Sequence, residues 1–244
     1  MRITRTPRTA PTTRRTLLRA SAATAAAGVL AAGSSPVGAA PRTPSATAAR
    51  PATPAAALKE LAAGNRRWRT FHQRHPHETA GVRSALVSGQ SPFALILGCI
   101  DSRVPPELVF DQGLGDLMTV RSAGEVLDEA VLGSIAYGVL ELGIPLVVVL
   151  GHQSCGAVAA AVHAEETGES LSAHIQYVAD QIRPAIVHGQ HGDARVDATV
   201  SAQVRLVRSR LARETDLAAK VAAGELAIVG ARYELSTQLV HGVG

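Results

Sequence analysis

Leu146-Val147-Val148-Val149-Leu150 is the stretch of sequence that decides the fold. It is apolar at every position and rich in β-branched valine, which is typical of a central parallel strand that is buried on both faces. Pro145 precedes it and Gly151 follows it, so the run has the length of a strand rather than that of a helix. The sequence therefore predicts a buried strand at the centre of a sheet.

Strands and helices alternate on both sides of this run. Short apolar runs predict further strands at 93–97, 117–120 and 226–229. Helical patterns start at Pro54 and cover 128–142, 156–163 and 198–223, the last of which is long enough for two helices. Residues 71–81 are expected to form a polar loop, and 165–193 a polar excursion with one short helix. This order predicts an α/β domain with a mainly parallel β-sheet core flanked by helices.

The composition excludes several classes of protein. A chain of 244 residues with 46% hydrophobic and 18% charged residues can bury a core and is not a disordered chain. Its formal charge of +4 suggests an anionic polymer as partner, but six arginines and no acids lie in residues 1–40. Without them, 18 basic residues face 20 acidic ones, a formal charge of −2. We therefore expect no nucleic-acid partner.

The N-terminus has the sequence pattern of a signal peptide for export. Thr13-Arg14-Arg15-Thr16-Leu17-Leu18-Arg19 resembles a bacterial twin-arginine signal, and a mild Ala-rich run at 20–32 follows it. Cleavage after Ala39 or Ala40 is expected, while a disordered Ala/Arg-rich tail is the alternative. We expect a twin-arginine signal peptide at 1–40, a flexible linker at 41–54 and one domain at 55–244. The expected location is periplasmic or extracellular, without a stable membrane anchor.

Polar side chains that can bind a metal follow two of the predicted strands. Cys99 and Asp101 come directly after the first strand, and His152 and Cys155 come after the central one. Ligand sites gather at the carboxyl ends of parallel strands, so the two groups should meet at one sheet edge. Two thiolates, an imidazole and one further oxygen suit zinc. Because these are the only two cysteines, a disulfide and a pair of inert buried thiols remain as alternatives.

Two motifs together resemble those of the β-class carbonic anhydrases. The segment Cys99-Ile100-Asp101-Ser102-Arg103 resembles their CxDSR motif, and Gly151-His152-Gln153-Ser154-Cys155-Gly156 is similar to their GHxxCG motif. The intervening segments 110–116 and 120–124 resemble the stretch that links these motifs in the family. The resemblance implies a zinc lyase that interconverts CO2 and bicarbonate through zinc-bound hydroxide.

The resemblance also implies a role for each matching residue. Cys99, His152 and Cys155 would bind one Zn²⁺ per chain. Asp101 and Arg103 match a dyad in which the arginine holds the aspartate off the metal in one state, whereas the aspartate is the fourth ligand in the other. Gln90 would hydrogen-bond bicarbonate. The implied substrate pocket consists of Gln90, Met118, Tyr137 and Gly156.

The chain departs from the family pattern at two positions. Glu125 stands where many members have an asparagine, and Met118 stands where many have a phenylalanine. Neither change touches the ligands or the dyad.

Two alternative functions fit the same residues. The chain could be a hydrolase of carbonyl sulfide or carbon disulfide with the same fold, or a non-catalytic zinc-binding module. The family resemblance implies a homodimer or an assembly of dimers, with each active site near the subunit interface. No role is predicted for the isolated histidines His163, His174, His188, His191 and His241.

Overall fold

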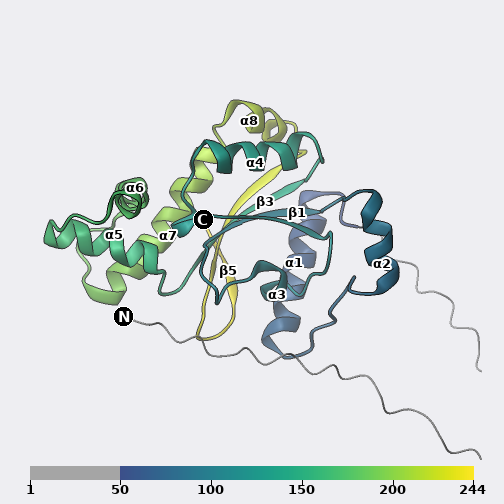
Figure 1. The fold of residues 1–244 in the computed structure, drawn as a ribbon, viewed down its shortest axis with the longest axis horizontal. Coiled ribbons are helices and arrows are strands. Elements are labelled where there is room, and N and C mark those ends of the chain that lie inside the picture. Colours follow the sequence, from purple (N-terminus) through teal and green to yellow (C-terminus); the bar gives the residue numbers. More distant parts are fainter. Residues whose placement is uncertain (1–49) are drawn as a thin grey trace, which may run out of the picture. The chain divides into compact units, whose positions relative to one another are not determined.

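A computed structural model describes residues 50–244, whose centre is a five-stranded sheet (Figure 1). The strands are β1 (Ala94–Gly98), β2 (Leu117–Arg121), β3 (Leu146–His152), β4 (Ala227–Tyr233) and β5 (Val240–Val243). Their order across the sheet is β2-β1-β3-β4-β5. The first four are mutually parallel and β5 is antiparallel to β4, so the prediction of a mainly parallel sheet flanked by helices is confirmed.

Helices connect the strands and cover both faces of the sheet. The α-helices are α1 (Pro54–Arg69), α2 (Ala80–Ala85), α3 (Pro106–Val109), α4 (Glu129–Leu140), α5 (Gly156–Thr167), α6 (Ala173–Ile182), α7 (Gly192–Leu211) and α8 (Thr215–Ala222). Three single-turn 3₁₀ helices are η1 (Leu86–Ser88), η2 (Ala123–Glu125) and η3 (Arg183–Ala185). Among the described residues, no helix combines the length and apolar character needed to cross a bilayer.

The central strand β3 is buried along its whole length, as its sequence predicts. Leu146, Val148 and Leu150 pack with α1 and α3 on one face of the sheet. Val147 and Val149 pack with α4, α7 and α8 on the other face (Figure 1). Alternate side chains of a strand point to opposite faces, so a run that is apolar throughout serves two cores at once.

The carboxyl ends of β1 and β3 lie side by side. Gly98 is in register with Leu150, and Cys99 follows directly after Gly98. His152 is the last residue of β3. The expected meeting of the two motifs at one edge of the sheet is therefore confirmed.

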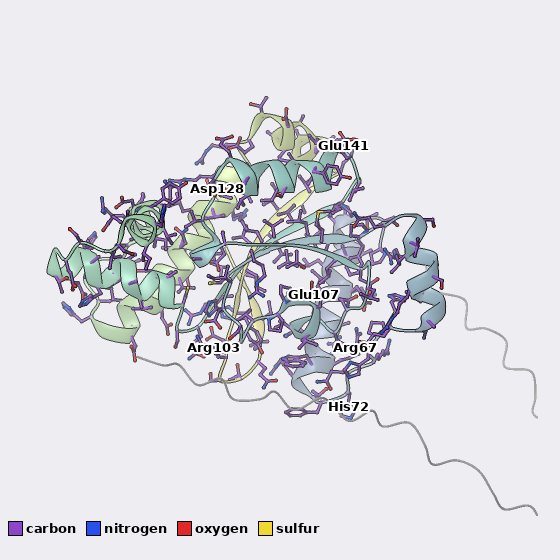
Figure 2. All side chains as sticks on the ribbon, in the orientation of Figure 1. Arg67, His72, Arg103, Glu107, Asp128 and Glu141 are labelled. Atoms are coloured by element: carbon purple, nitrogen blue, oxygen red, sulfur yellow. The ribbon has the colours of Figure 1, made fainter. Side chains whose placement is uncertain are left out.

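Helix α4 begins where the sequence indicates. The Asp128 carboxylate, labelled in Figure 2, accepts a hydrogen bond of 2.8 Å from the Val131 amide and caps the helix. The helix ends at Leu140, two residues before the predicted end, and Gly143 adopts a positive φ of 65° in the turn to β3. That backbone conformation favours glycine because a Cβ would be strained there.

The second half of the chain differs from the prediction in its boundaries. Helix α6 is the one short helix expected in the excursion, and α7 and α8 are separate helices. However, α7 begins at Gly192, six residues before its predicted start. The early turns are held by buried Arg195, which pairs with Glu165 and Glu166 of α5. Because charged side chains hold these early turns, the sequence shows no apolar periodicity there, and the pattern misses the start of the helix.

Several short elements escape the sequence patterns. Helices α2 and α3 and strand β5 have only six, four and four residues. Within residues 71–81, which are predicted to form a polar loop, His77 Nδ1 lies 2.7 Å from the buried Asp116 carboxylate. The helix pattern from Pro54 is confirmed as α1. The predicted signal peptide and most of the predicted linker, residues 41–49, lie outside the described residues.

Candidate metal centre

Three buried side chains form a cluster with the donor atoms of a metal site. The ligand atoms of Cys99, His152 and Cys155 all lie within 4.8 Å of one another. Cys99 follows β1, His152 ends β3, and Cys155 is the N-cap residue of α5. Ser154, with a positive φ of 54°, turns the backbone between the last two. It is the only such cluster of His, Cys, Asp and Glu found in residues 50–244.

The donor geometry fits zinc better than a disulfide. The two sulfur atoms are 3.9 Å apart and unbonded. A Zn–S bond of about 2.3 Å in a tetrahedral site puts two sulfurs about 3.8 Å apart, whereas a disulfide bond is about 2.05 Å long. His152 Nδ1 lies 2.9 Å from the Gln153 carbonyl, while its buried Nε2 has no partner. The free Nε2 therefore faces the two sulfurs as a third ligand atom.

The two thiols differ in their acidity. The hydrogen bond from Cys155 lowers the pKa of Cys99 to about 4, with help from His152 and the Gly124 amide and against the effect of burial. The same hydrogen bond raises the pKa of Cys155, as does its burial. Thiolate is the form that binds zinc, so the lowered pKa of Cys99 suits a sulfur ligand.

Asp101 and Arg103 form the ion pair that the family resemblance implies. Arg103 Nε and Nη2 donate to Asp101 Oδ1 and Oδ2 at 2.9 and 2.7 Å. This arginine lowers the pKa of Asp101 to about 2. Asp101 Oδ2 lies 3.9 Å from His152 Nε2. The carboxylate is thus held beside the three-donor cluster, on Arg103, whose half-exposed side chain is labelled in Figure 2.

Arg121, at the end of β2, braces the loop that carries Cys99 and Asp101. Its Nε donates to the Cys99 carbonyl at 2.7 Å and its Nη2 to the Asp101 carbonyl at 2.6 Å. Sequence reasoning gave this residue no role, although it lies in the segment that resembles the family. Because Arg121 holds the backbone of Cys99 and Asp101 from the neighbouring strand, it is a positioning residue of the site.

A cavity of about 430 Å³ opens at the cluster. Its lining includes Cys99, Asp101 and, as predicted for the pocket, Gly156. The rest comes from Ile100, Ala123 and the small or apolar side chains of α5 and α6, with one histidine. CO2 is apolar and small, so an open, mainly apolar cavity suits it.

The other predicted pocket residues lie elsewhere in this single chain. Met118 and Tyr137 line a groove between β2 and α4, and Tyr137 is half exposed. Gln90 is exposed beside η1, in the segment before β1. One chain therefore does not bring these three residues into the cavity at Cys99.

Glu125 is a fully buried acid behind the cluster. Its Oε1 has no hydrogen-bond partner, and its backbone φ is positive at 54°. Burial raises its pKa well above the ordinary value, and the negative charge of Cys99 adds to this effect. The asparagine-to-glutamate departure in the sequence thus places a buried carboxyl group with a raised pKa near Cys99.

Glu125→Gln is expected to be more stable than the wild type, and the difference should grow as the pH rises. Above the ordinary pKa of 4.5 the unfolded chain loses a proton that folded Glu125 retains, so this residue weakens folding with increasing pH. The melting temperature should exceed that of the wild type by about 3 °C or more near pH 8, and by less near pH 5. Thermal melts of zinc-loaded protein measure this, with the same substitution at the exposed Glu214 as the control. An equal difference at both pH values would contradict a raised pKa of Glu125.

Comparisons with known proteins agree with this site. Residues 94–240 match the family model described as "Carbonic anhydrase". "Carbonic anhydrase 2" of Mycobacterium tuberculosis is 45% identical over 184 residues, covering 75% of this chain and 89% of the relative. A carbonic anhydrase of Mycolicibacterium smegmatis is 44% identical over 185 residues, covering 75% and 90%.

Solved structures share the fold. A Coccomyxa β-carbonic anhydrase in complex with acetazolamide is 26% identical with a TM-score of 0.61, covering 76% of this chain and 86% of that one. A tetrameric β-carbonic anhydrase of Sordaria macrospora is 19% identical with a TM-score of 0.63, covering 77% and 96%. With two cysteines and a histidine placed for zinc, and with these relatives, the chain belongs to the β-class carbonic anhydrase family of zinc lyases.

Proposed function

We propose that this protein catalyses the reversible hydration of CO2 to bicarbonate and a proton, with one Zn²⁺ per chain held by Cys99, His152 and Cys155. One observation carries this proposal above the others. The ligand atoms of Cys99, His152 and Cys155 lie within 4.8 Å of one another, the Nε2 of His152 has no hydrogen-bond partner, and Cys99 lines an apolar cavity. The Asp101–Arg103 pair lies beside this cluster and Asp101 also lines the cavity.

The residues around the metal centre have different roles in the proposed reaction. Bound zinc would supply a strongly acidified water near neutral pH. Asp101 is ionised at that pH and can accept a hydrogen bond that orients the attacking oxygen. Arg103 keeps Asp101 ionised and fixes both of its oxygens through two charge-assisted hydrogen bonds. A further role of Asp101 as a reversible fourth ligand remains part of this proposal.

The proposed enzyme is a homodimer or an assembly of dimers. Gln90, Met118 and Tyr137 lie at the surface of one chain or in an open groove, away from the cavity. They can serve as pocket residues only if a partner subunit presents them to the cavity. Dilution should therefore lower activity per zinc in step with dissociation, measured by sedimentation velocity. Full activity of an isolated monomer would contradict a shared pocket.

The location is proposed from the sequence alone. Residues 1–40 would direct export by the twin-arginine route to the periplasm or the medium, and the enzyme would be released without a membrane anchor. Replacing Arg14 and Arg15 together with lysine should retain the protein inside the cell. Unchanged secretion of this variant would argue against the twin-arginine route.

Substrate comparison tests the proposed reaction. Zinc-loaded protein should hydrate CO2 in a stopped-flow assay with a pH indicator, and its kcat/KM for CO2 should exceed those for carbonyl sulfide and carbon disulfide. The small apolar cavity alone does not separate these linear molecules, so the comparison uses one preparation with a measured zinc content. Hydrolysis of either sulfur compound without CO2 hydration would replace the proposed function by that of the sulfur hydrolases.

A further inference from the structure

Hydration of CO2 leaves a proton that must reach the solvent. Water and CO2 give bicarbonate and one H⁺, and the site is ready for another turnover only when that proton has left. Few side chains at the cavity can carry it. Asp101 is ionised and occupied by Arg103, an arginine does not release its proton, and Cys99 belongs to the metal cluster.

One other titratable side chain lines the same cavity. His174, in the first turn of α6, shares the cavity lining with Cys99, Asp101 and Gly156. The side chain is exposed to solvent, and no hydrogen bond or ion pair joins it to another side chain of residues 50–244. It thus borders the cavity on one side and the solvent on the other. Its neighbours in the lining, Ile175 and Val178, are apolar and cannot relay protons.

We infer that His174 is the proton relay between the metal centre and external buffer. An imidazole accepts a proton on one ring nitrogen and releases one from the other, and histidine is the side chain suited to this near neutral pH. The proton from CO2 hydration passes to His174, directly or through water in the cavity, and then to a buffer base. The imidazole returns to its neutral form, so the step needs no other reactant. This inference rests on the proposed function.

The main test is the buffer dependence of His174→Ala. In dilute buffer its kcat should fall by about tenfold or more, because proton transfer limits turnover, whereas kcat/KM for CO2 should stay near the wild-type value. Added imidazole should restore kcat towards the wild-type level. The matched control is His163→Ala, an exposed histidine on α5 outside the cavity lining, which should change neither parameter.

The outcomes separate this inference from the proposed function. If wild-type protein hydrates CO2 but His174→Ala keeps full kcat in dilute buffer, His174 is not the relay. A loss that imidazole does not rescue, or an equal loss in kcat/KM, would mean a structural role and would also overturn the inference. If zinc-loaded wild-type protein fails to hydrate CO2 at any buffer concentration, the proposed function itself is wrong.

A second readout does not depend on turnover. Diethyl pyrocarbonate modifies neutral, accessible imidazoles, and mass spectrometry locates the adduct. In the zinc-loaded wild type at neutral pH, His174 should be modified at a rate comparable to that of His163. Protection of His174 while His163 reacts would show that it is closed off from solvent, and this would contradict a relay role. Zinc content should be unchanged in His174→Ala.

Discussion

His152→Ala is expected to abolish zinc binding and CO2 hydration together. Removing this imidazole leaves only two sulfur ligands, at Cys99 and Cys155, in a site that uses three donors from the protein. Loss of an outer partner of a metal ligand already weakens binding by about 10–100-fold, so loss of a ligand should exceed this range. Zinc per chain after gel filtration and stopped-flow CO2 hydration measure the two effects.

The matched control for this variant is His163→Ala. His163 is exposed on α5 and lies near Glu169 rather than near the cluster, so its loss should change neither zinc content nor activity. Circular dichroism should verify that His152→Ala is folded, since it empties a fully buried position. Retention of stoichiometric zinc by the folded variant would contradict the assignment of His152 as a ligand.

Asp101→Asn is expected to lower kcat/KM by about 100-fold or more while the protein keeps its zinc. The amide has nearly the same shape, but it carries no charge for Arg103 and is a weaker acceptor for the attacking water. The three donors of the cluster remain in place, so the metal should stay bound. The measurement is CO2 hydration at equal zinc content.

Asp216→Asn is the control for this change. It makes the same substitution in the first turn of α8, on an exposed residue that the cavity does not include. Its activity should equal that of the wild type. If Asp101→Asn keeps full activity with zinc bound, the ion pair with Arg103 serves structure and not the reaction.

The metal centre could be predicted because its ligands depend on sheet topology. An apolar run such as β3 must be a central strand, and parallel neighbours place their carboxyl ends together. That rule predicts that Cys99 and His152 lie close together, and the family resemblance implies that both bind zinc. The structure confirms the adjacency, and the separation of the two sulfurs excludes a disulfide between them in the described fold.

Other features of the site depend on packing that the sequence pattern does not contain. Arg121 acts through hydrogen bonds to two backbone carbonyls. Every residue has a backbone carbonyl, so no pattern of side chains in the sequence indicates these contacts. His174 reaches the cavity only because α6 folds back over α5, where Val158, Ala179 and Ile182 share a core. The sequence shows only a lone histidine in a polar stretch, and this does not indicate that α6 packs against α5.

The pocket residues show a different limit. Gln90, Met118 and Tyr137 were assigned from the family resemblance, and a single chain leaves them outside the cavity. The single chain therefore gives no support for a role of these residues in the pocket, and that role belongs to the proposal that a partner subunit presents them.

A zinc titration of CO2 hydration tests the role of the metal centre most directly. Protein stripped of metal by a chelator is reloaded with increasing zinc, and each sample is assayed by stopped flow. We expect no catalysis without zinc and a linear rise in rate that stops at one zinc per chain. Hydration that is independent of zinc, or a fully loaded protein that does not hydrate CO2, would contradict this expectation.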